Sequence, residues 1–289
     1  MRVAAGVGDV DMVRRLFDQV STSPVDGCLA LRLEELLPSG VRLRAPIPRG
    51  PGSAGDVGIA VGLSVICDAA GGWATALAQG SELSGPTIEL RVDHAWPPAD
   101  DARWMIAESR LRHTVGEAAS ITVDVVDEQG RELAHAQGHF VLDTPGAGAQ
   151  PQEWATFDGV VLDRPDELLA ALAGRPEADP DKWTVTATPQ LANPRGQVHG
   201  GVLMAIGQLA QRRAQVEWVP RVKGNVERAA PSPLSIQVDY LRPAMADGSE
   251  LSCDTEYLRN GRRFRTLHTE LTRQDGRVAA TVTGLWSVA

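Results

Sequence analysis

The chain has 289 residues, of which 43% are hydrophobic and 22% charged, so it is long and apolar enough to bury two ordinary cores. Its net charge of −9 argues against bulk nucleic-acid binding, although a local basic patch could still hold phosphates. We find no stretch long and apolar enough to span a bilayer and no signal-peptide core near the start, and therefore expect a cytoplasmic protein. The three cysteines are widely separated and form no CxxC pair, so we expect no disulfides.

The first half of the chain is expected to contain a lead helix, a strand, a long apolar helix and a run of alternating strands. Hydrophobic residues fill most positions near residues 59–78, which predicts the long helix. The lead helix is expected at 11–20, and the strands near 40–45, 87–95, 104–112, 118–127 and 132–142.

The second half repeats this plan after a linker rich in proline and glycine at residues 144–152. Asn260–Gly261 and Asp275–Gly276 are hairpin signals, so neighbouring strands are expected to pair antiparallel. One long helix wrapped by a curled antiparallel sheet is the α+β arrangement called the hot-dog fold, and we predict two in tandem. Helices are expected near 165–172 and 200–217, with strands near 182–188, 234–241, 250–258, 263–272 and 277–287.

The two halves also align as diverged copies. Aligning Leu63 with Leu203 places Ile66 on Ile206, and residues 92–97 match residues 238–243. Two long repeats in one chain predict a built-in pseudo-dimer. The predicted repeats are residues 1–146 and 147–289.

The most informative motif is Asn193, followed after five residues by His199, Gly200 and Gly201, directly before the apolar helix of the second repeat. Unpaired backbone N–H groups and the helix dipole favour negative charge at a helix start. The glycines would let a ligand carbonyl approach these donors, which predicts an oxyanion hole. The alternative interpretation is a loop-to-helix joint with His199 as a polar cap.

Asp68 is the acidic residue within the apolar helix of the first repeat. Burial of a lone carboxylate without a partner is costly, so we interpret Asp68 as functional. The alternative is a polar residue that caps a solvent-facing turn.

The Asn193 and His199-Gly200-Gly201 motif, the helix behind it and the strand ending in Arg242-Pro243 resemble the hot-dog acyl-CoA thioesterases of the phenylacetyl-CoA thioesterase type. The resemblance covers residues 182–288 and, more weakly, residues 40–142. It implies a thioester hydrolase that needs no cofactor, because coenzyme A is part of the substrate.

The family pattern is divided between the two repeats. Family members carry an aspartate nine residues after the motif histidine, where the second repeat has Gln208 and the first has Asp68. They also carry Ser or Thr ten residues before the strand-ending proline, where the first repeat has Thr87 and the second Pro233. In the first repeat, Ile59 and Ser53 replace the motif histidine and asparagine. Because family dimers combine the motif of one subunit with the acid of the other, the resemblance implies one complete composite site and one dismantled site.

The resemblance implies that a backbone N–H of Gly200 or Gly201 polarises the thioester carbonyl, while Asn193 holds the carbonyl or the loop. Asp68 would act as a general base on a water molecule, with direct attack to give an anhydride as the alternative. Thr87 would orient that water or carboxylate. His199 would either assist near the departing sulfur or brace the loop.

Three arginines flank the hairpin signal Asn260–Gly261 and are candidates for clamping the phosphates of coenzyme A: Arg259, Arg262 and Arg263. The alternative is an ordinary solvated hairpin tip. His135 and His139 lie on one face of a strand, but without a third ligand nearby we expect no metal site.

The predicted function is hydrolysis of an acyl-CoA or another acyl thioester, with a dimer of tandem chains as a hypothesis. Two alternatives stay open. The first is a non-catalytic acyl-CoA or lipid-binding hot-dog protein, since much of the symmetric machinery has been lost. The second is a hot-dog hydratase, although no aspartate precedes a histidine in the loop pattern of that family.

Overall fold

The computed structural model describes residues 23–48, 53–79, 85–95, 99–142, 172, 174–176, 179, 181–218 and 231–288. The predicted lead helix at 11–20, the linker and the boundary at residue 146 lie outside these residues, as does all of the second lead helix except residue 172. The core helices and strands can therefore be compared with the sequence, whereas these connecting segments cannot.

Among the described residues, the first repeat has one long helix and six strands, and those that were predicted follow in the order expected from the hydrophobic pattern. The short helix α2 and the strand β1 were not predicted. The elements are α2 (Pro24–Cys28), β1 (Arg32–Leu37), β2 (Gly40–Pro46), α3 (Ser53–Gln79), β3 (Thr87–His94), β4 (Trp104–Val115), β5 (Ala118–Val126) and β6 (Glu132–Val141).

The second repeat follows the same plan. Its only additions among the described residues are the two-residue strand β7 and a short 3-10 helix, η1. The elements are β7 (Arg175–Pro176), β8 (Lys182–Thr186), η1 (Pro189–Leu191), α5 (Gly200–Trp218), β9 (Ser232–Tyr240), β10 (Glu250–Asn260), β11 (Phe264–Arg273) and β12 (Val278–Ser287). Both predicted hairpins are confirmed, and Gly276 has the positive φ, 76°, that the turn between β11 and β12 requires.

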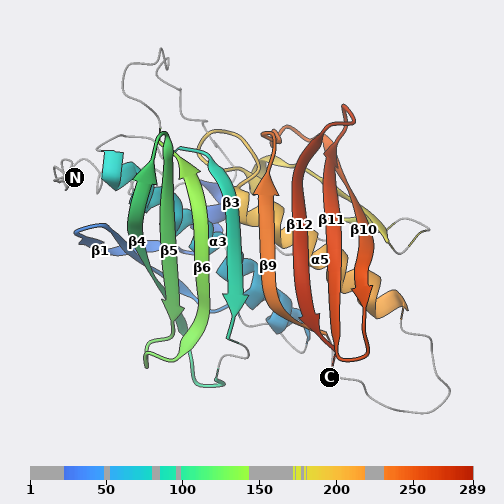
Figure 1. Cartoon of the computed structure of the whole chain (residues 1–289), viewed down its shortest axis with the longest axis horizontal. Coiled ribbons are helices and arrows are strands. Elements are labelled where there is room, and N and C mark those ends of the chain that lie inside the picture. Colours follow the sequence, from blue (N-terminus) through green and yellow to red (C-terminus); the bar gives the residue numbers. More distant parts are fainter. Residues whose placement is uncertain are drawn as a thin grey trace.

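The strands of the described residues all join one twelve-stranded antiparallel sheet, which runs continuously through both repeats (Figure 1). Its order is β1-β2-β4-β5-β6-β3-β9-β12-β11-β10-β8-β7. Reading outward from the junction of β3 and β9, each strand of one repeat has its counterpart at the same place in the other. The sheet is therefore built like that of a symmetric dimer whose two subunits have been joined.

The register at the junction reproduces the alignment of the repeats. Arg91 of β3 pairs with Gln237 of β9, and these two residues are counterparts in the sequence alignment. Because each lies opposite its own counterpart, a pseudo-twofold axis passes between them. Bulges also recur at equivalent places, between positions 111 and 113 in the first repeat and 257 and 259 in the second.

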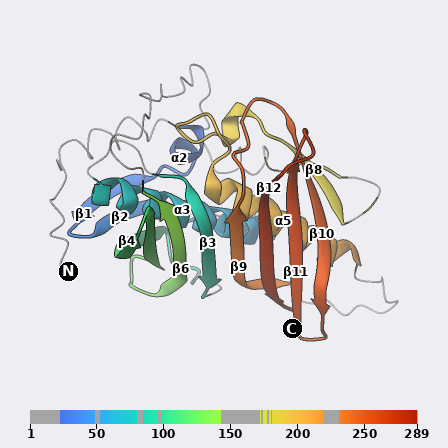
Figure 2. The same ribbon diagram turned by 45° about the horizontal axis from the view of Figure 1, so that its top comes forward.

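Both long helices lie on the same face of the sheet, which Figure 2 shows from a second direction. Helix α3 contacts β2 to β6, α5 contacts β8 to β12, and the two helices contact each other. The start of α5 packs against the middle of α3, where a Cβ on Gly201 would lie 2.5 Å from both the Ser64 carbonyl oxygen and Val65 Cα. This approach brings residues of the two repeats together.

One expectation about helix α3 was wrong. Residues Gly58–Gln79 are long and apolar enough to cross a membrane by length and composition alone. Within the structure, however, 89% of the apolar window is buried, because the helix is enclosed by its sheet and by α5. Its apolarity is therefore accounted for by the protein core.

Candidate active site

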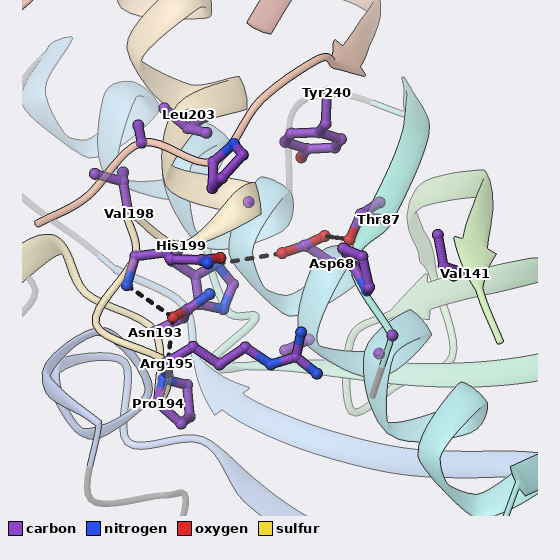
Figure 3. Close-up of a pocket in the computed structure, with 18 of the residues that line it drawn as sticks. Asp68, Thr87, Val141, Asn193, Pro194, Arg195, Val198, His199, Leu203 and Tyr240 are labelled. Carbon is purple, nitrogen blue, oxygen red and sulfur yellow. Dashed lines mark hydrogen bonds and ion pairs between the residues drawn. The ribbon is translucent and has the colours of Figure 1, made fainter. Parts of the chain in front are cut away.

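A cavity of about 450 Å³ lies where the two repeats meet, close to the start of α5. Its wall includes apolar side chains such as Trp73, Ile88 and Leu203. Polar groups gather on one side, where Figure 3 shows Asp68, Thr87 and His199 pointing toward one another. A mainly apolar cavity with a few convergent polar groups is typical of a small-molecule site.

Asp68 is held by hydrogen bonds from both repeats. Asp68 lies in α3 and is buried, with an exposed fraction of 8%. The Thr87 hydroxyl donates to Asp68 Oδ1 at 2.8 Å, and the Gly201 backbone N–H donates to Asp68 Oδ2 at 2.9 Å. The positive end of the α5 dipole therefore faces the Asp68 carboxylate. This geometry does not fit the alternative of a polar cap on a solvent-facing turn.

His199 is buried beside Asp68, immediately before α5. Its Nδ1 lies 3.3 Å from Asp68 Oδ2, and the Gly201 N–H approaches the same nitrogen at 3.1 Å. Its Nε2 faces a second carboxylate, that of Asp26, at 3.8 Å. The imidazole therefore lies between two acidic side chains, both contributed by the first repeat.

The two motif glycines have different roles in this geometry. The Gly201 N–H is engaged by Asp68, so it is not available to a substrate carbonyl in the arrangement observed. Gly200 lines the cavity, and its N–H donates no hydrogen bond to another described residue. Of the two N–H groups predicted for an oxyanion hole, only that of Gly200 fits. A Cβ on Gly200 would lie 2.6 Å from Asp68 Oδ2, which explains the need for glycine.

Asn193 braces the loop that leads to His199. Its Oδ1 accepts hydrogen bonds from the backbone N–H groups of Arg195 at 2.9 Å and Gln197 at 3.1 Å. With these bonds the side chain closes a local turn of the kind that asparagine commonly stabilises. Of the two roles predicted for Asn193, the structure shows the one that holds the loop.

The position related to this site by the pseudo-twofold axis lacks this chemistry. Gln208, the counterpart of Asp68, is buried, and its Oε1 has no hydrogen-bond partner among the described residues. Ile59 and Pro233 are also buried, in place of the motif histidine and Thr87. The side chain of Ser53 lies outside the described part of the structure. An amide cannot take up a proton as a carboxylate does, so these residues cannot repeat the arrangement around Asp68.

Asp26 and Tyr240 are titratable residues of the cavity wall that were not predicted. Burial raises the pKa of Asp26, and the Asp68 charge adds to this rise, while His199 and a hydrogen bond from Ser23 oppose it. Burial also raises the pKa of Tyr240 well above its usual value, again with a contribution from Asp68. Because its pKa is raised, the Tyr240 hydroxyl stays protonated at neutral pH. It has no hydrogen-bond partner among the described residues and can act as a donor in the cavity wall.

His94 occupies the position of Tyr240 in the first repeat. Both of its ring nitrogens are buried without a partner among the described residues. Burial lowers its pKa from 6.5 to about 4, although the neighbouring Asp93 charge opposes the shift. The imidazole is therefore neutral in the folded protein at neutral pH.

This burial predicts a loss of stability in mild acid. Below pH 6.5 the unfolded chain binds a proton on His94, while the folded protein resists it until about pH 4. Protonation of His94 therefore leaves the free energy of unfolding unchanged above pH 6.5. Between pH 6.5 and about pH 4 it lowers this free energy by about 1.4 kcal/mol for each unit by which the pH falls. Urea unfolding at several pH values would measure it. In His94→Gln the dependence on pH should be shallower by that amount, and an identical slope would contradict the assignment.

The arginines predicted to bind phosphates do not line the cavity. On β12, Ala280 pairs with the cavity residue Tyr240, whereas Ser287 pairs with Phe264 beside the hairpin of Arg259, Arg262 and Arg263. The hairpin therefore lies at the opposite end of the strands, about 20 Å away at the usual rise per residue. The cavity wall therefore does not include these arginines, and their role in binding the phosphates of coenzyme A stays a prediction.

Two other cations, Arg195 and Arg242, do line the cavity. Arg195 lies in the loop braced by Asn193, and Figure 3 shows its side chain extending toward the same space. Arg242 follows β9 and donates a hydrogen bond to the Val278 carbonyl at 3.0 Å.

In the described part of the chain, no group of three metal-ligating side chains is present. His135 and His139 instead pair with the carboxylates of Asp124 and Glu89, at 2.7 Å each.

Comparison with known families identifies the second repeat. Residues 188–287, which include the His199 motif and α5, match the family model described as the acyl-CoA thioesterase N-terminal domain. The matched segment is therefore similar to an acyl-CoA thioesterase domain. The match places the protein among the thioester hydrolases, as the resemblance implied. In this thioesterase the matched domain stands in the second half of the chain, although its family description calls it N-terminal.

Solved structures extend the likeness in fold to both repeats of the thioesterase. The acyl-CoA thioesterase II TesB2 of Mycobacterium marinum aligns over 92% of this chain and 96% of its own, with a TM-score of 0.53 and 14% identity. The tesB protein of Mycobacterium avium subs paratuberculosis aligns over 93% and 100%, with a TM-score of 0.54 and 14% identity. These likenesses establish the double hot-dog fold. No curated protein matches the sequence.

The resemblance to the phenylacetyl-CoA type in particular has weak support. The PaaI protein of E. coli, from the phenylacetic acid degradation operon, aligns over only 43% of this chain, with 22% identity. Its TM-score of 0.35 is too low to favour that type within the family. The acyl group is therefore not assigned by this comparison.

Proposed function

We propose that this thioesterase hydrolyses acyl-CoA at one composite site between its repeats. The observation that carries the proposal is the hydrogen bond from the Gly201 N–H of the second repeat to the Asp68 carboxylate of the first. It joins the acid to the family motif beside an apolar cavity. The second, dismantled position lacks an acid, so we assign it no turnover.

In the proposed reaction, Asp68 acts as a general base. It takes a proton from a water molecule whose oxygen attacks the thioester carbonyl carbon. The Gly200 N–H, at the start of α5, then stabilises the negative charge on the carbonyl oxygen. The tetrahedral intermediate collapses, the carbon–sulfur bond breaks, and the thiolate of coenzyme A departs.

The hydrogen bonds to Asp68 favour this route over direct attack by the carboxylate. Thr87 donates to one carboxylate oxygen and Gly201 to the other, so both oxygens have a donor that restrains them and withdraws charge. A restrained carboxylate can still accept a proton from a nearby water. Formation of an anhydride would instead require one oxygen to leave its donor and bond to the acyl carbon.

The ends of the substrate are assigned from the cavity wall. The apolar side, with Trp73, Ile88 and Leu203, suits the acyl chain. Arg195 and Arg242 suit the phosphates of coenzyme A, because guanidinium groups bind phosphate through paired N–H donors. The cytoplasmic location and the dimer of tandem chains stay predictions.

Thiol release from short, long and aromatic acyl-CoAs tests the proposed function. We expect turnover of at least one of them by the purified full chain, without added metal or cofactor. Release is followed with a thiol reagent, and each acyl-CoA without protein gives the background rate. Binding of the same acyl-CoAs without any turnover would contradict hydrolysis and favour the non-catalytic binding function.

A further inference from the structure

The Asp26 carboxylate is a buried acidic group that the proposed reaction does not use. It belongs to α2, is 6% exposed as a residue and lines the cavity. Its Oδ2 accepts a hydrogen bond of 2.6 Å from the Ser23 hydroxyl. Its Oδ1 has no hydrogen-bond partner in the described structure and faces His199 Nε2 at 3.8 Å.

This placement is costly unless the two side chains interact. A buried carboxylate without a donor loses its hydration with little in return. Besides Ser23 on its own segment, the charged or titratable groups that act on Asp26 are His199 before α5 and Asp68 on α3. Asp68 repels it, so His199 Nε2 is the group that can compensate the unpaired oxygen.

The opposite side of the His199 ring has different requirements. Nδ1 lies 3.1 Å from the Gly201 nitrogen, whose single N–H is shared between Nδ1 and Asp68 Oδ2, and 3.3 Å from Asp68 Oδ2. A hydrogen on Nε2 would face the acceptor Asp26 and leave Nδ1 as an acceptor for Gly201. A hydrogen on Nδ1 alone would leave Nε2 facing a carboxylate with no proton between them, and would direct a donor at the base, Asp68.

We propose that Asp26 is a positioning residue that keeps a hydrogen on His199 Nε2 and thereby holds Nδ1 toward the Gly201 N–H. The inference rests on the proposed function, because it concerns the same site. Its consequence is that His199 does not compete for the basic oxygens of Asp68. The second repeat alone cannot provide this control, since Asp26 and Asp68 both come from the first.

Asp26→Asn tests the proposal because it removes the charge with little change in shape. Partners that orient an active-site histidine typically contribute about 10- to 100-fold, so we expect kcat to fall by about that factor with KM little changed. In a double-mutant cycle with His199→Gln, Asp26→Asn should add almost no further loss. Full additivity of the two losses would overturn the proposal, because Asp26 would then act without His199.

A second measurement reads the histidine directly and does not depend on turnover. In protein labelled with ¹⁵N at its six histidines, the signals of His199 are assigned by their loss in His199→Gln. We expect the hydrogen on Nε2 in the wild type and a shift toward Nδ1 in Asp26→Asn. An unchanged His199 spectrum in the variant would overturn the proposal.

Asp127→Asn is the matched control. It removes another buried carboxylate, held by Arg131 and by the backbone N–H of Gln129, that does not line the cavity. This variant should leave both kcat and the His199 spectrum unchanged. If the wild type released no thiol from any acyl-CoA, the proposed function would fail, while the spectrum would still decide whether Asp26 controls His199.

Discussion

Asp68→Asn is expected to lower the turnover of acyl-CoA by about 10³-fold, which is within the usual contribution of a general base. Asparagine has nearly the same shape and can still accept the hydrogen bond from Thr87, so we expect the protein to fold. Its amide cannot take a proton from water. Its NH₂ group would face the Gly201 N–H, which is a donor and cannot accept a hydrogen bond. Thiol release and thermal unfolding, measured on the same preparation, separate loss of catalysis from loss of structure.

Gln208→Ala is the matched control because Gln208 occupies the counterpart position in the other repeat. It should change turnover by less than about twofold, since no acid is present there for it to assist. Equal losses from Asp68→Asn and Gln208→Ala would contradict the one-site proposal. They would indicate that both halves of the chain take part in turnover.

Gly201→Ala is expected to reduce both stability and turnover. The new methyl group would meet the Ser64 carbonyl oxygen and Val65 Cα, both 2.5 Å from the ideal Cβ position. These are backbone atoms of α3, so the first turn of α5 must move away, and the Gly201 N–H would leave Asp68. Overpacking of this kind typically costs about 1–3 kcal/mol. Urea unfolding and thiol release should both show the loss, with turnover reduced about tenfold or more.

Two other glycines provide comparisons for this prediction. In Gly200→Ala the methyl group would meet the Asp68 carboxylate at 2.6 Å, so turnover should fall with less loss of stability. Gly276→Asn changes a hairpin glycine with nothing within 4 Å and a φ of 76° that asparagine tolerates, so turnover should be kept. Full turnover by Gly201→Ala would show that the contact between Gly201 and Asp68 is unnecessary.

The sequence predicted the parts of the fold that repeat a simple pattern. Helices α3 and α5 and most strands could be recognised because their apolar residues recur with helical or alternating spacing. The relation between Asp68 and the His199 motif was implied by the family resemblance, once the two repeats had been aligned. The structure shows the contact between Asp68 and the motif, whereas the catalytic roles of these residues stay predictions.

The missed features depend on packing that spacing does not encode. Asp26 lies in a five-residue helix, too short to give a periodic signal, and far in sequence from His199. The two N–H groups of Gly200 and Gly201 could not be told apart until the contact with Asp68 was known. The distance between the hairpin arginines and the cavity could be recognised only from the register of β10 to β12, and phosphate binding by these arginines stays a prediction.

The junction between β3 and β9 bears on why the two repeats are joined. At the pseudo-twofold axis, Arg91 faces Gln237, and each hydrogen-bonds to the aspartate two residues further along its own strand. A dimer of two identical first repeats would place two arginines directly opposite each other, and like charges in that position repel. Within one chain the pair can differ. Joining the two repeats in one chain therefore permits a mixed pair at the centre of the sheet, which a homodimer of either repeat could not have.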